Sequence, residues 1–341
     1  MKPKIVVIGS ANTDFVLTMP ELPSKGETVL GDQFRVVRGG KGANQAVAAA
    51  RLGADVTFVA RLGKDSFGNE AVAAYREEGI STEFIVQDAD IHSGVALILV
   101  NQSGENMIAV GPGANGRLTP GDVRAASDAI READCVLLQL EIPLDAVQAA
   151  VEIAHSSNVR VILNPAPAQK LSPELLKSID ILTPNETEAA ILAGQDSSSK
   201  DQKSLAELAS ILGIPQLVVT LGSRGACIVE GGERTDVPTF TIKPVDTTAS
   251  GDAFNGALAV ALARGEYDLG VELLQAAANA EAALPVPFGP PVLAKPSAEL
   301  LGDELLAKGR KSDAANAYRQ ALAAAPNRRR SVEGLKASAA H

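Results

Sequence analysis

The sequence predicts an α/β fold in which a mostly parallel, Rossmann-like sheet carries helices on both faces. Short runs rich in Val, Ile and Leu recur along the chain, and longer helical patterns separate them. The apolar runs are continuous, as expected for strands that are buried on both faces. With 341 residues and 46% hydrophobic content, the chain is long enough to bury such a core.

Each strand is expected where an apolar run of strand length stands between helical patterns. The expected strands are Lys4–Gly9, Val56–Ala60, Val95–Val100, Cys135–Leu140, Arg160–Leu163, Ile181–Thr183, Gln216–Thr220 and Ala226–Val229. The expected helices are Gly42–Leu52, Ser66–Glu78, Pro120–Ala133, Leu144–His155, Glu186–Leu192, Lys203–Leu212 and Asp252–Ala263. Ligands of such folds lie beyond the carboxyl ends of the strands.

Two segments depart from this alternation of strands and helices. Phe15–Val36 has short alternating apolar positions between turn residues, and Ser93–Val110 offers more extended chain. We expect residues 12–37 and 93–110 to form a small β-sheet that covers the site as a lid.

Charge and composition exclude several classes of protein. The net charge of −10 argues against a general nucleic-acid or membrane binder, and no apolar run has the length of a signal peptide or a membrane span. Cys135 and Cys227 are interpreted as buried thiols, which favours a cytoplasmic location. The histidines His92, His155 and His341 occur in no catalytic or metal-ligand spacing.

The segment Pro244–Gly256 is the most informative one for chemistry. A polar turn leads directly into an Ala-rich apolar stretch, which predicts a loop at the N-terminus of a buried helix. The backbone N–H groups of Ala249, Ser250 and Gly251 would bind an anion there, with Asp252 beside them. An anion cradle next to one carboxylate suits phosphoryl transfer to a hydroxyl group.

A second glycine-rich segment, Arg38–Gln45, precedes a helix and lacks the Walker spacing. Lys41 and Asn44 are candidates for hydrogen bonds to hydroxyl groups. Taken alone, this segment is equally consistent with a structural turn.

Polar side chains at the expected ligand edge are further candidates. Asn12 and Asp14 are two residues apart in extended chain, so they point the same way and can bind a diol. Glu141 ends another expected strand. Each of them taken singly is also consistent with a solvated residue at a strand end.

Two later segments each have two interpretations. Asn185 and Glu188 fit a helix-capping box, and Glu188 is alternatively a carboxylate for hydrated Mg²⁺. The segment Thr220–Gly225 is either a hairpin turn or a loop that presents N–H groups and a hydroxyl to nucleotide phosphates.

Together, Gly39–Ala46 and Asp246–Asp252 resemble the two signatures of the ribokinase group of the PfkB-type carbohydrate kinases, and the resemblance extends over roughly residues 4–284. It implies ATP-dependent phosphorylation of the 5-hydroxyl of D-ribose, with a β-sheet lid that is commonly shared across a homodimer. It further implies that Asp252 is the catalytic base and that Ala249 to Gly251 form the anion hole.

The resemblance also implies the binding residues. Sugar contacts correspond to Asn12, Asp14, Gly40, Lys41, Gly42, Ala43, Asn44, Glu141 and Asp252. Nucleotide contacts correspond to Asn185, Thr220, Gly222, Gly225, Gly251 and Asn279. Glu188 corresponds to the acid linked to Mg²⁺ through water, and Asp246 and Thr248 to ligands of an activating monovalent cation, K⁺.

The chain departs from this family after residue 284. A Pro-rich linker at 285–297 replaces a Gly-containing loop that would complete the cation site and border the adenine. Residues 298–341 are expected to form a helical hairpin that resembles a single tetratricopeptide repeat. A lone repeat would dock on the body, pair with another subunit or protein, or stay loose.

Three functions therefore remain open at this point. The first is a ribokinase. The second is a kinase for another pentose or a nucleoside. The third is a catalytically impaired sugar-binding protein whose C-terminal repeat is an interaction module; the presence of Asp252 and of the whole anion-binding turn favours an enzyme.

Overall fold

A computed structural model of the chain describes residues 2–103, 105–194, 205–238, 249–265, 301–303, 305–306, 309–324 and 335–338. The expected cation ligands Asp246 and Thr248, the expected nucleotide contact Asn279 and the Pro-rich linker 285–297 lie outside these residues.

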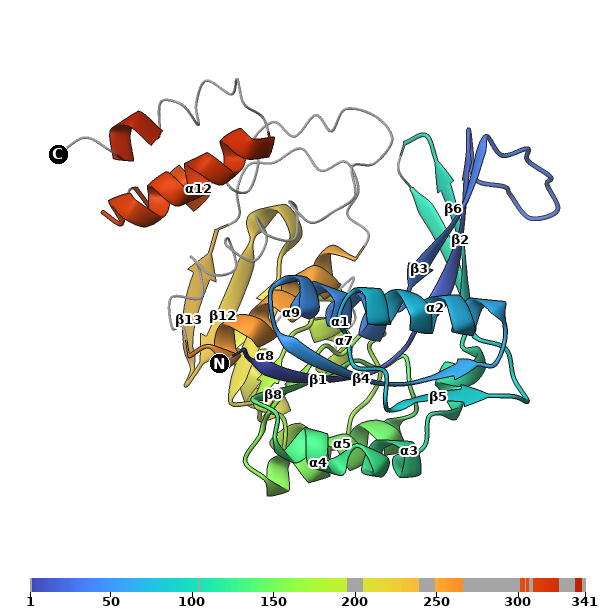
Figure 1. Cartoon of the computed structure of the whole chain (residues 1–341), viewed down its shortest axis with the longest axis horizontal. Coiled ribbons are helices and arrows are strands. Elements are labelled where there is room, and N and C mark those ends of the chain that lie inside the picture. The colour runs from blue at the N-terminus through green and yellow to red at the C-terminus, as the bar shows by residue number, and fades with distance from the viewer. Residues whose placement is uncertain are drawn as a thin grey trace.

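The predicted α/β fold is confirmed. Its main sheet has the strand order β13-β12-β11-β10-β9-β8-β1-β4-β5, and the strands from β11 to β5 run parallel to one another (Figure 1). Antiparallel β12 and β13 extend one edge. The strands are β1 (Lys4–Ile8), β4 (Asp55–Gly63), β5 (Ile85–Asp88), β8 (Cys135–Leu138), β9 (Arg160–Leu163), β10 (Ile181–Leu182), β11 (Gln216–Thr220), β12 (Ala226–Glu230) and β13 (Glu233–Val237).

Helices cover both faces of this sheet, with α1, α2 and α9 on one side and α3, α4 and α5 on the other (Figure 1). The alternation of β1 explains the two layers, because Ile5 and Val7 pack toward α1 and α9 whereas Val6 and Ile8 pack toward α5. The helices are α1 (Lys41–Arg51), α2 (Ser66–Glu77), α3 (Pro120–Ala125), α4 (Ser127–Arg131), α5 (Leu144–Ser156), α6 (Pro173–Lys177), α7 (Glu186–Leu192), α8 (Leu205–Leu212) and α9 (Ser250–Ala263), with 3₁₀ turns η1 (Gly113–Arg117) and η2 (Gly222–Arg224).

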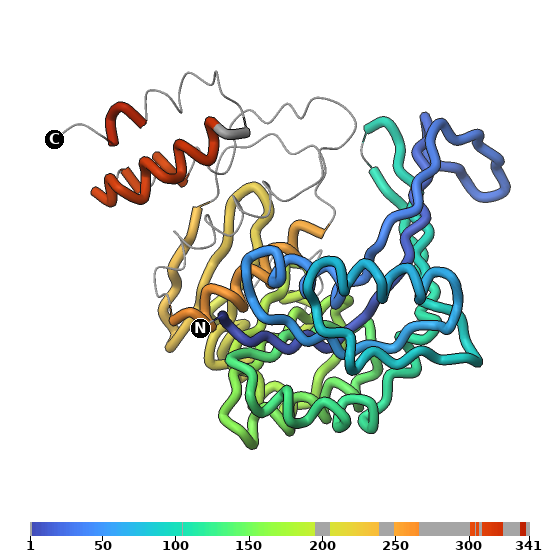
Figure 2. The backbone as a smooth tube through the Cα atoms, viewed as in Figure 1, coloured from blue at the N-terminus to red at the C-terminus, as the bar shows by residue number. Residues whose placement is uncertain are grey.

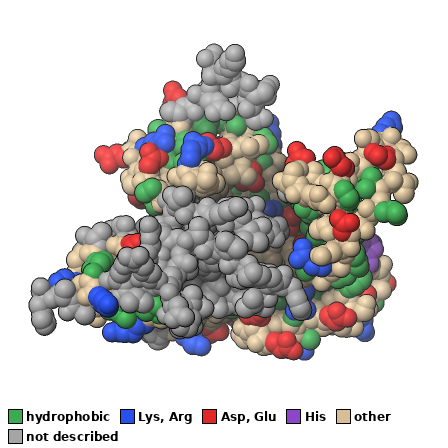
Figure 3. Space-filling view, turned by 90° about the horizontal axis from the view of Figure 1, so that it is seen from above, with side chains coloured by type: hydrophobic (Ala, Val, Ile, Leu, Met, Phe, Trp, Pro, Cys, Tyr) green, Lys and Arg blue, Asp and Glu red, His purple; other side chains and the backbone are tan. Residues whose placement is uncertain are grey.

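A second sheet of four strands stands off from this body, and the tube in Figure 2 traces it as one arm of the molecule. Its order is β3 (Gln33–Gly39), β2 (Asn12–Met19), β6 (Gly94–Asn101) and β7 (Asn106–Gly111). These strands are the predicted smaller sheet. In the space-filling view, this arm carries apolar side chains among acidic ones (Figure 3).

Helices α1 and α9 follow the two glycine-rich signatures, and they pack directly on each other. A Cβ atom at Gly256 would lie 2.7 Å from Cβ of Ala48 and 2.8 Å from the carbonyl oxygen of Gln45. The absence of a side chain at Gly256 thus lets the helices approach closely, and this brings their first turns together at one end of the sheet.

The described part of the C-terminal segment has its own small core. Leu301 and Leu305 pack with Ala314 and Tyr318 of α12 (Lys311–Ala324), and the Tyr318 hydroxyl donates to Oδ1 of Asp303 over 2.5 Å. This packing is compatible with the expected helical hairpin. The likeness to a tetratricopeptide repeat stays a prediction.

The structure differs from the expected elements in four places. The helix expected at Pro120–Ala133 is two helices that meet at Ala126. The strands β5 and β13 and the helix α6 were not expected, because β13 is largely exposed and β5 and α6 are short.

Within the described residues, no helix combines the length and apolar character needed to cross a membrane.

Candidate active site

Asp252 lies in the first turn of α9, at the carboxyl end of the parallel strands. Its side chain is only 5% exposed, and each of its carboxylate oxygens accepts a hydrogen bond. Nδ2 of Asn44 donates to Oδ2 over 3.0 Å, and Nε2 of Gln45 donates to Oδ1 over 3.0 Å. The two glycine-rich signatures therefore meet at this carboxylate.

The environment of Asp252 raises the pKa of its carboxyl group. Burial is the largest cause, and the nearby carboxylate of Glu141 adds to it. The ammonium group of Lys41 and the amides of Asn44 and Gln45 act in the opposite direction, since they favour the ionised form. A raised pKa makes the carboxylate a better proton acceptor than an exposed Asp.

The described start of α9, from Ala249 on, has the features of a helix N-terminus that can bind an anion. Ala249 is the N-cap residue and has left-handed backbone angles, with φ of 59°. The first N–H groups of a 14-residue helix have no acceptors within the helix, and its dipole places positive charge at this end. Ala249 and Asp252 line the same cavity.

Asp14 faces Asp252 from β2 and carries an unsatisfied oxygen. Among the described residues, its Oδ1 atom is buried and has no hydrogen-bond partner. Burial, followed by the charges of Glu141 and Asp252, raises the pKa of Asp14 to about 6. A carboxylate in this state gains from a ligand that donates a hydrogen bond, such as a sugar hydroxyl.

Asn12, two residues before Asp14 on β2, lines the same cavity. Its Oδ1 atom accepts a hydrogen bond from Nδ2 of Asn115 over 2.7 Å, and Asn115 also accepts one from the backbone N–H of Ala11 over 2.9 Å. Asn12 is therefore oriented before any ligand binds.

Glu141 lines the same cavity beside the start of α1. Its Oε2 atom accepts hydrogen bonds from Oγ of Ser10 over 2.5 Å and from the backbone N–H of Lys41 over 3.1 Å. Gly40, the N-cap of α1, has φ of 91°, and a Cβ atom there would lie 2.7 Å from the backbone nitrogen of Asn12. Only glycine fits this approach without strain.

These side chains enclose a cavity of about 270 Å³. The structure thus brings together eight residues that the sequence singled out: Asn12, Asp14, Gly40, Lys41, Asn44, Glu141, Ala249 and Asp252. Gly42 and Ala43 lie buried in the first turn of α1, where their N–H groups face Ser10. The small sheet contributes Ala96, Ile98, Asn106, Ile108 and Val110, which sequence reasoning did not single out.

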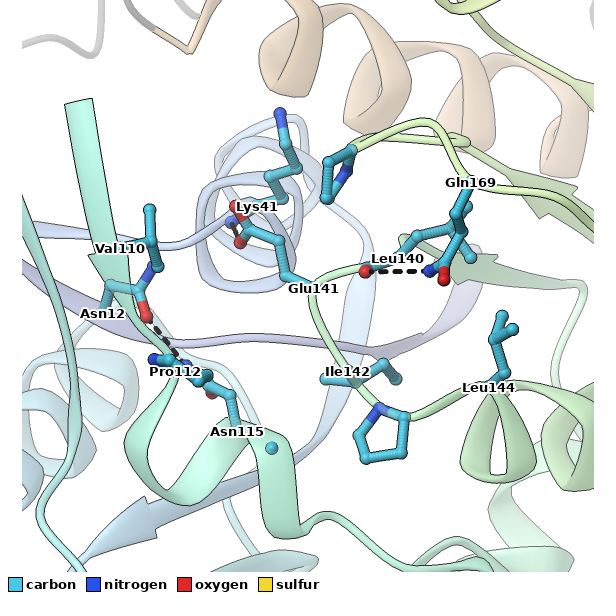
Figure 4. A pocket seen from close by; sticks show the side chains of 13 residues that line it. Asn12, Lys41, Val110, Pro112, Asn115, Leu140, Glu141, Ile142, Leu144 and Gln169 are labelled. Carbon is cyan, nitrogen blue, oxygen red and sulfur yellow. Dashed lines mark hydrogen bonds between the residues drawn. The ribbon is translucent and has the colours of Figure 1, made fainter. Parts of the chain in front are cut away.

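A second cavity of about 510 Å³ adjoins the first (Figure 4). Asn12, Lys41, Val110 and Glu141 line both of them. The second cavity is mainly apolar in its remaining walls, which are Pro112, Asn115, Gly116, Leu140, Ile142, Pro143, Leu144, Pro167 and Gln169.

Four of the residues expected to contact a nucleotide, Asn185, Thr220, Gly222 and Gly225, lie around β10 and β11, whereas Gly251 lies in the first turn of α9. Asn185 caps α7 in a capping box with Glu188, in which Asn185 Oδ1 and Glu188 Oε2 each accept a backbone N–H over 2.8 Å. Asn185 also pairs with Thr220 at the end of β11. Burial raises the pKa of Glu188, and the charge of Asp252 adds to this effect.

The segment from Thr220 to Gly225 has the hairpin geometry that was one of its two interpretations. It joins antiparallel β11 and β12, and Gly222 and Gly225 have φ of 58° and 96°. Thr220 pairs with Asn185, another expected nucleotide contact. The hairpin geometry is therefore also compatible with a loop that contacts nucleotide phosphates.

No group of three or more His, Cys, Asp and Glu side chains in the described part of the chain is arranged to hold a metal ion. The capping box uses the Oε2 atom of Glu188. Its Oε1 atom fits a contact to Mg²⁺ through water, since this ion keeps several waters when bound. Cys135 and Cys227 are free and buried, as expected.

Sequence reasoning missed several functional candidates besides the residues of the small sheet. Gln45, Asn115 and Asn164 are buried polar side chains that touch or support the site, and their positions in apolar or turn segments gave little indication of this. Gln45 lies within the signature Gly39–Ala46, so the sequence did contain an indication that this residue matters.

The chain is similar to known proteins along most of its length. The model of the family described as pfkB family carbohydrate kinase matches residues 2–286. A ribokinase of Haemophilus influenzae is 43% identical over 282 residues, which are 82% of this chain and 92% of that protein. A deoxyribokinase of Salmonella typhi is 36% identical over 257 residues, which are 75% and 84% of the two chains.

A solved structure shares the fold. The structure of Arabidopsis thaliana ribokinase complexed with ribose and ATP has a TM-score of 0.73 at 33% identity, and the match covers 84% of this chain and 94% of that one. The family match over most of the chain and the convergence of both signatures on one cavity lead to the same conclusion: this chain belongs to the pfkB family of carbohydrate kinases.

Proposed function

We propose that this chain transfers the γ-phosphoryl group of ATP to the 5-hydroxyl group of D-ribose and releases ribose 5-phosphate and ADP. The observation that carries this proposal is the cavity in which Asp252, at the N-terminus of α9, faces Asp14, whose Oδ1 is unsatisfied among the described residues. Similarity to ribokinases, such as the 43% identity to that of Haemophilus influenzae, supports the choice of sugar.

In this proposal, Asp252 orients the 5-hydroxyl and accepts its proton as the new P–O bond forms. The bond between the γ-phosphorus and the β,γ-bridging oxygen breaks, and ADP leaves with that oxygen. N–H groups of Ala249, Ser250 and Gly251 stabilise the negative charge on the migrating phosphoryl group. The hydrogen bonds from Asn44 and Gln45 hold the carboxylate in place for this step.

Ribose binds in the same cavity. Asn12 and Asp14 bind the sugar diol, and Lys41, Asn44 and Glu141 bind its other oxygens, with Gly40, Gly42 and Ala43 allowing close approach. The preset orientation of Asn12 and the unsatisfied oxygen of Asp14 among the described residues support this assignment.

ATP binds along the adjoining edge of the sheet. We assign Asn185, Thr220, Gly222, Gly225, Gly251 and Asn279 to its contacts. Glu188 would hold Mg²⁺ through water, and when bound the ion neutralises phosphate charge. Asp246 and Thr248 are assigned to a monovalent cation such as K⁺.

The small sheet closes over the site as a lid, and a second copy of the chain contacts it. Residues on the cavity side of this sheet alternate with apolar residues on the opposite side. Phe34 is 60% exposed and Leu97 is 54% exposed on that opposite side, which supports a contact between two lids.

The remaining assignments concern organisation. Residues 1–284 are the kinase domain, 285–297 are a linker, and 298–341 are a tetratricopeptide-like segment that contacts a protein surface. The small packed cluster around Tyr318 supports a separate helical unit. We also assign the protein to the cytoplasm.

The adjoining cavity favours one second candidate, a kinase for a nucleoside or another pentose. Asn12 and Glu141 line both cavities, and the apolar walls of the second cavity lie beyond them. A ribose that carries a substituent would therefore have room. An assay of ADP release with ribose, deoxyribose, other pentoses and nucleosides separates the candidates. A kcat/KM for any nucleoside above that for ribose would overturn the proposal.

A further inference from the structure

Behind Asp252, buried polar side chains form a closed ring of hydrogen bonds. Gln45 Nε2 donates to Asp252 Oδ1 over 3.0 Å and to Asn164 Oδ1 over 3.4 Å. Asn164 Nδ2 donates to the carbonyl oxygen of Thr183 over 2.8 Å, and the Thr183 hydroxyl donates to Asn255 Oδ1 over 2.5 Å. Asn255 Nδ2 returns to α9 by donating to the carbonyl oxygen of Gly251 over 2.8 Å.

Gln45 is the member of this ring that touches the catalytic carboxylate. It is fully buried and does not line the sugar cavity, whereas Asn44 does. The two oxygens of Asp252 are therefore held differently. Oδ2 is bound by Asn44 at the cavity wall, and Oδ1 is bound by Gln45 from within the protein.

A second glutamine supports the orientation of the Gln45 amide. Nε2 of Gln139 donates to Oε1 of Gln45 over 2.5 Å, and the NH₂ group of Gln45 faces Asp252. If the Gln45 amide turned over, its oxygen would face the carboxylate of Asp252, which is repulsive whichever way the Gln139 amide points. The carboxylate therefore fixes the orientation, and the hydrogen bond from Gln139, whose own Oε1 atom has no partner among the described residues, adds to it.

We propose that Gln45 is a positioning residue for the phosphoryl transfer, oriented by Gln139, and that it holds Oδ1 of Asp252 so that Oδ2 meets the sugar hydroxyl. This inference rests on the proposed function only in needing Asp252 as the proton acceptor. Gln45 does not line the sugar cavity, so its removal is expected to act through the groups that it holds, with Asp252 first among them.

The ring has a second consequence for the same turn. Through Asn255 it holds the Gly251 carbonyl, and through Thr183 it reaches the segment before Asn185 on the nucleotide side. The carboxylate of Asp252 and the start of α9 are thus tied to the sheet edge as one unit, which keeps the proposed proton acceptor in register with the N–H groups proposed to bind the phosphoryl group.

The test compares Gln45→Met with the unmodified enzyme. Methionine keeps the length of the side chain and removes its donor. We expect kcat to fall roughly 10- to 100-fold, because small misplacements of a reacting group have effects of this size. The Kd for the sugar, measured by calorimetry without ATP, should change less than about threefold, because the residue does not line the sugar cavity.

The pH profile of kcat supplies a readout that a purely structural role would not move. The Gln45 hydrogen bond favours ionised Asp252, so its loss raises the pKa of that carboxyl group, and the acidic limb of the profile should move to higher pH. The other charged groups that influence Asp252 are Lys41, Glu141, Asp14 and Glu188, and the variant leaves them all in place.

Thr183→Val is the matched control. It removes hydrogen bonds from the same ring at similar burial and without change of shape, but the bond between Gln45 and Asp252 remains. Both variants should lower the melting temperature, whereas only Gln45→Met should shift the acidic limb. An equal shift in both variants would reduce Gln45 to a structural role and overturn the proposal.

Gln139→Met tests the same proposal without altering Gln45, and it serves if Gln45→Met does not fold. We expect a smaller fall in kcat and a shift of the acidic limb in the same direction. A folded variant at either position with unchanged kcat and unchanged pH profile would contradict the proposal. The comparison uses whichever sugar the unmodified enzyme phosphorylates, so a wrong choice of sugar does not affect it.

Discussion

Nδ2 of Asn44 lies 3.0 Å from Oδ2 of Asp252, which joins the first turn of α1 to the first turn of α9. The two residues belong to signatures far apart in the sequence. Gly256 allows this contact, because its missing side chain lets the two helices lie against each other. One hydrogen bond thus joins the residues proposed to bind the sugar to those proposed to bind the phosphoryl group.

Replacement of Asp252, the proposed proton acceptor, gives the most direct prediction. Asp252→Asn should lower kcat by about 10²- to 10⁴-fold, because the amide cannot accept the proton of the sugar hydroxyl. The shape of the site is kept, so ATP binding measured by calorimetry should be nearly unchanged. A variant that retains near-normal kcat would rule out the proposed mechanism.

Sugar binding should depend on the ionisation of Asp14. Its pKa in the free enzyme is about 6, and the ionised carboxylate is the better acceptor for sugar hydroxyls. The Kd for ribose should therefore rise as the pH falls from 7.5 through about 6, as measured by calorimetry. Asp14→Asn should bind ribose more weakly at pH 7.5 and lose this pH dependence; if the variant keeps the dependence, another group is responsible.

The same carboxyl group has an opposite effect on stability. A folded-state pKa above the usual value of 3.8 for an Asp means that folded Asp14 retains its proton where unfolded Asp14 has lost it. Its contribution to stability is thus greatest below about pH 4 and declines as the pH rises through about 6. Asp14→Asn should consequently raise the melting temperature at pH 7.5, and calorimetric scans at several pH values test this.

Close packing of α1 and α9 predicts the effect of a single methyl group. Gly256→Ala should destabilise the protein by about 1–3 kcal/mol, because its Cβ atom overlaps Ala48 and the backbone of Gln45. Gly121→Ala in α3 is the matched control, since the nearest atom to its Cβ would be Oγ1 of Thr119 at 3.5 Å. That variant should be neutral or more stable in denaturant unfolding. Equal effects of the two would contradict the packing argument.

The outer side of the small sheet predicts an association between chains. Leu97→Lys should weaken dimer formation at least about tenfold, because it places a charge in an apolar contact. Sedimentation at several protein concentrations measures this. Lys64→Glu on the main body is the control, because its exposed side chain lies outside the small sheet. An unmodified protein that is monomeric at all concentrations would make the predicted dimer wrong.

Local patterns in the sequence were enough to predict the elements that carry the core. Continuous apolar runs such as Gln216–Thr220 and helix signals such as Asn185 gave strands and helices close to those observed. The exposed strand β13 lacks such a pattern, and the helix expected at Pro120–Ala133 gave no sign of its break at Ala126. Short or exposed elements depend on neighbours that a local pattern does not contain.

The sequence by itself determined the α/β class and the helices that begin after Gly40 and Ala249, and it singled out Asp252 as the proposed proton acceptor, because each depends on residues adjacent in the chain. Only the tertiary structure decided which polar groups meet. Asp14 carries an oxygen that has no hydrogen-bond partner among the described residues. The ring behind Asp252 joins segments that are distant in the sequence. Burial and charge act through space, and so the raised pKa of Asp14 and the orientation of Gln45 arise only when the strands and helices pack together.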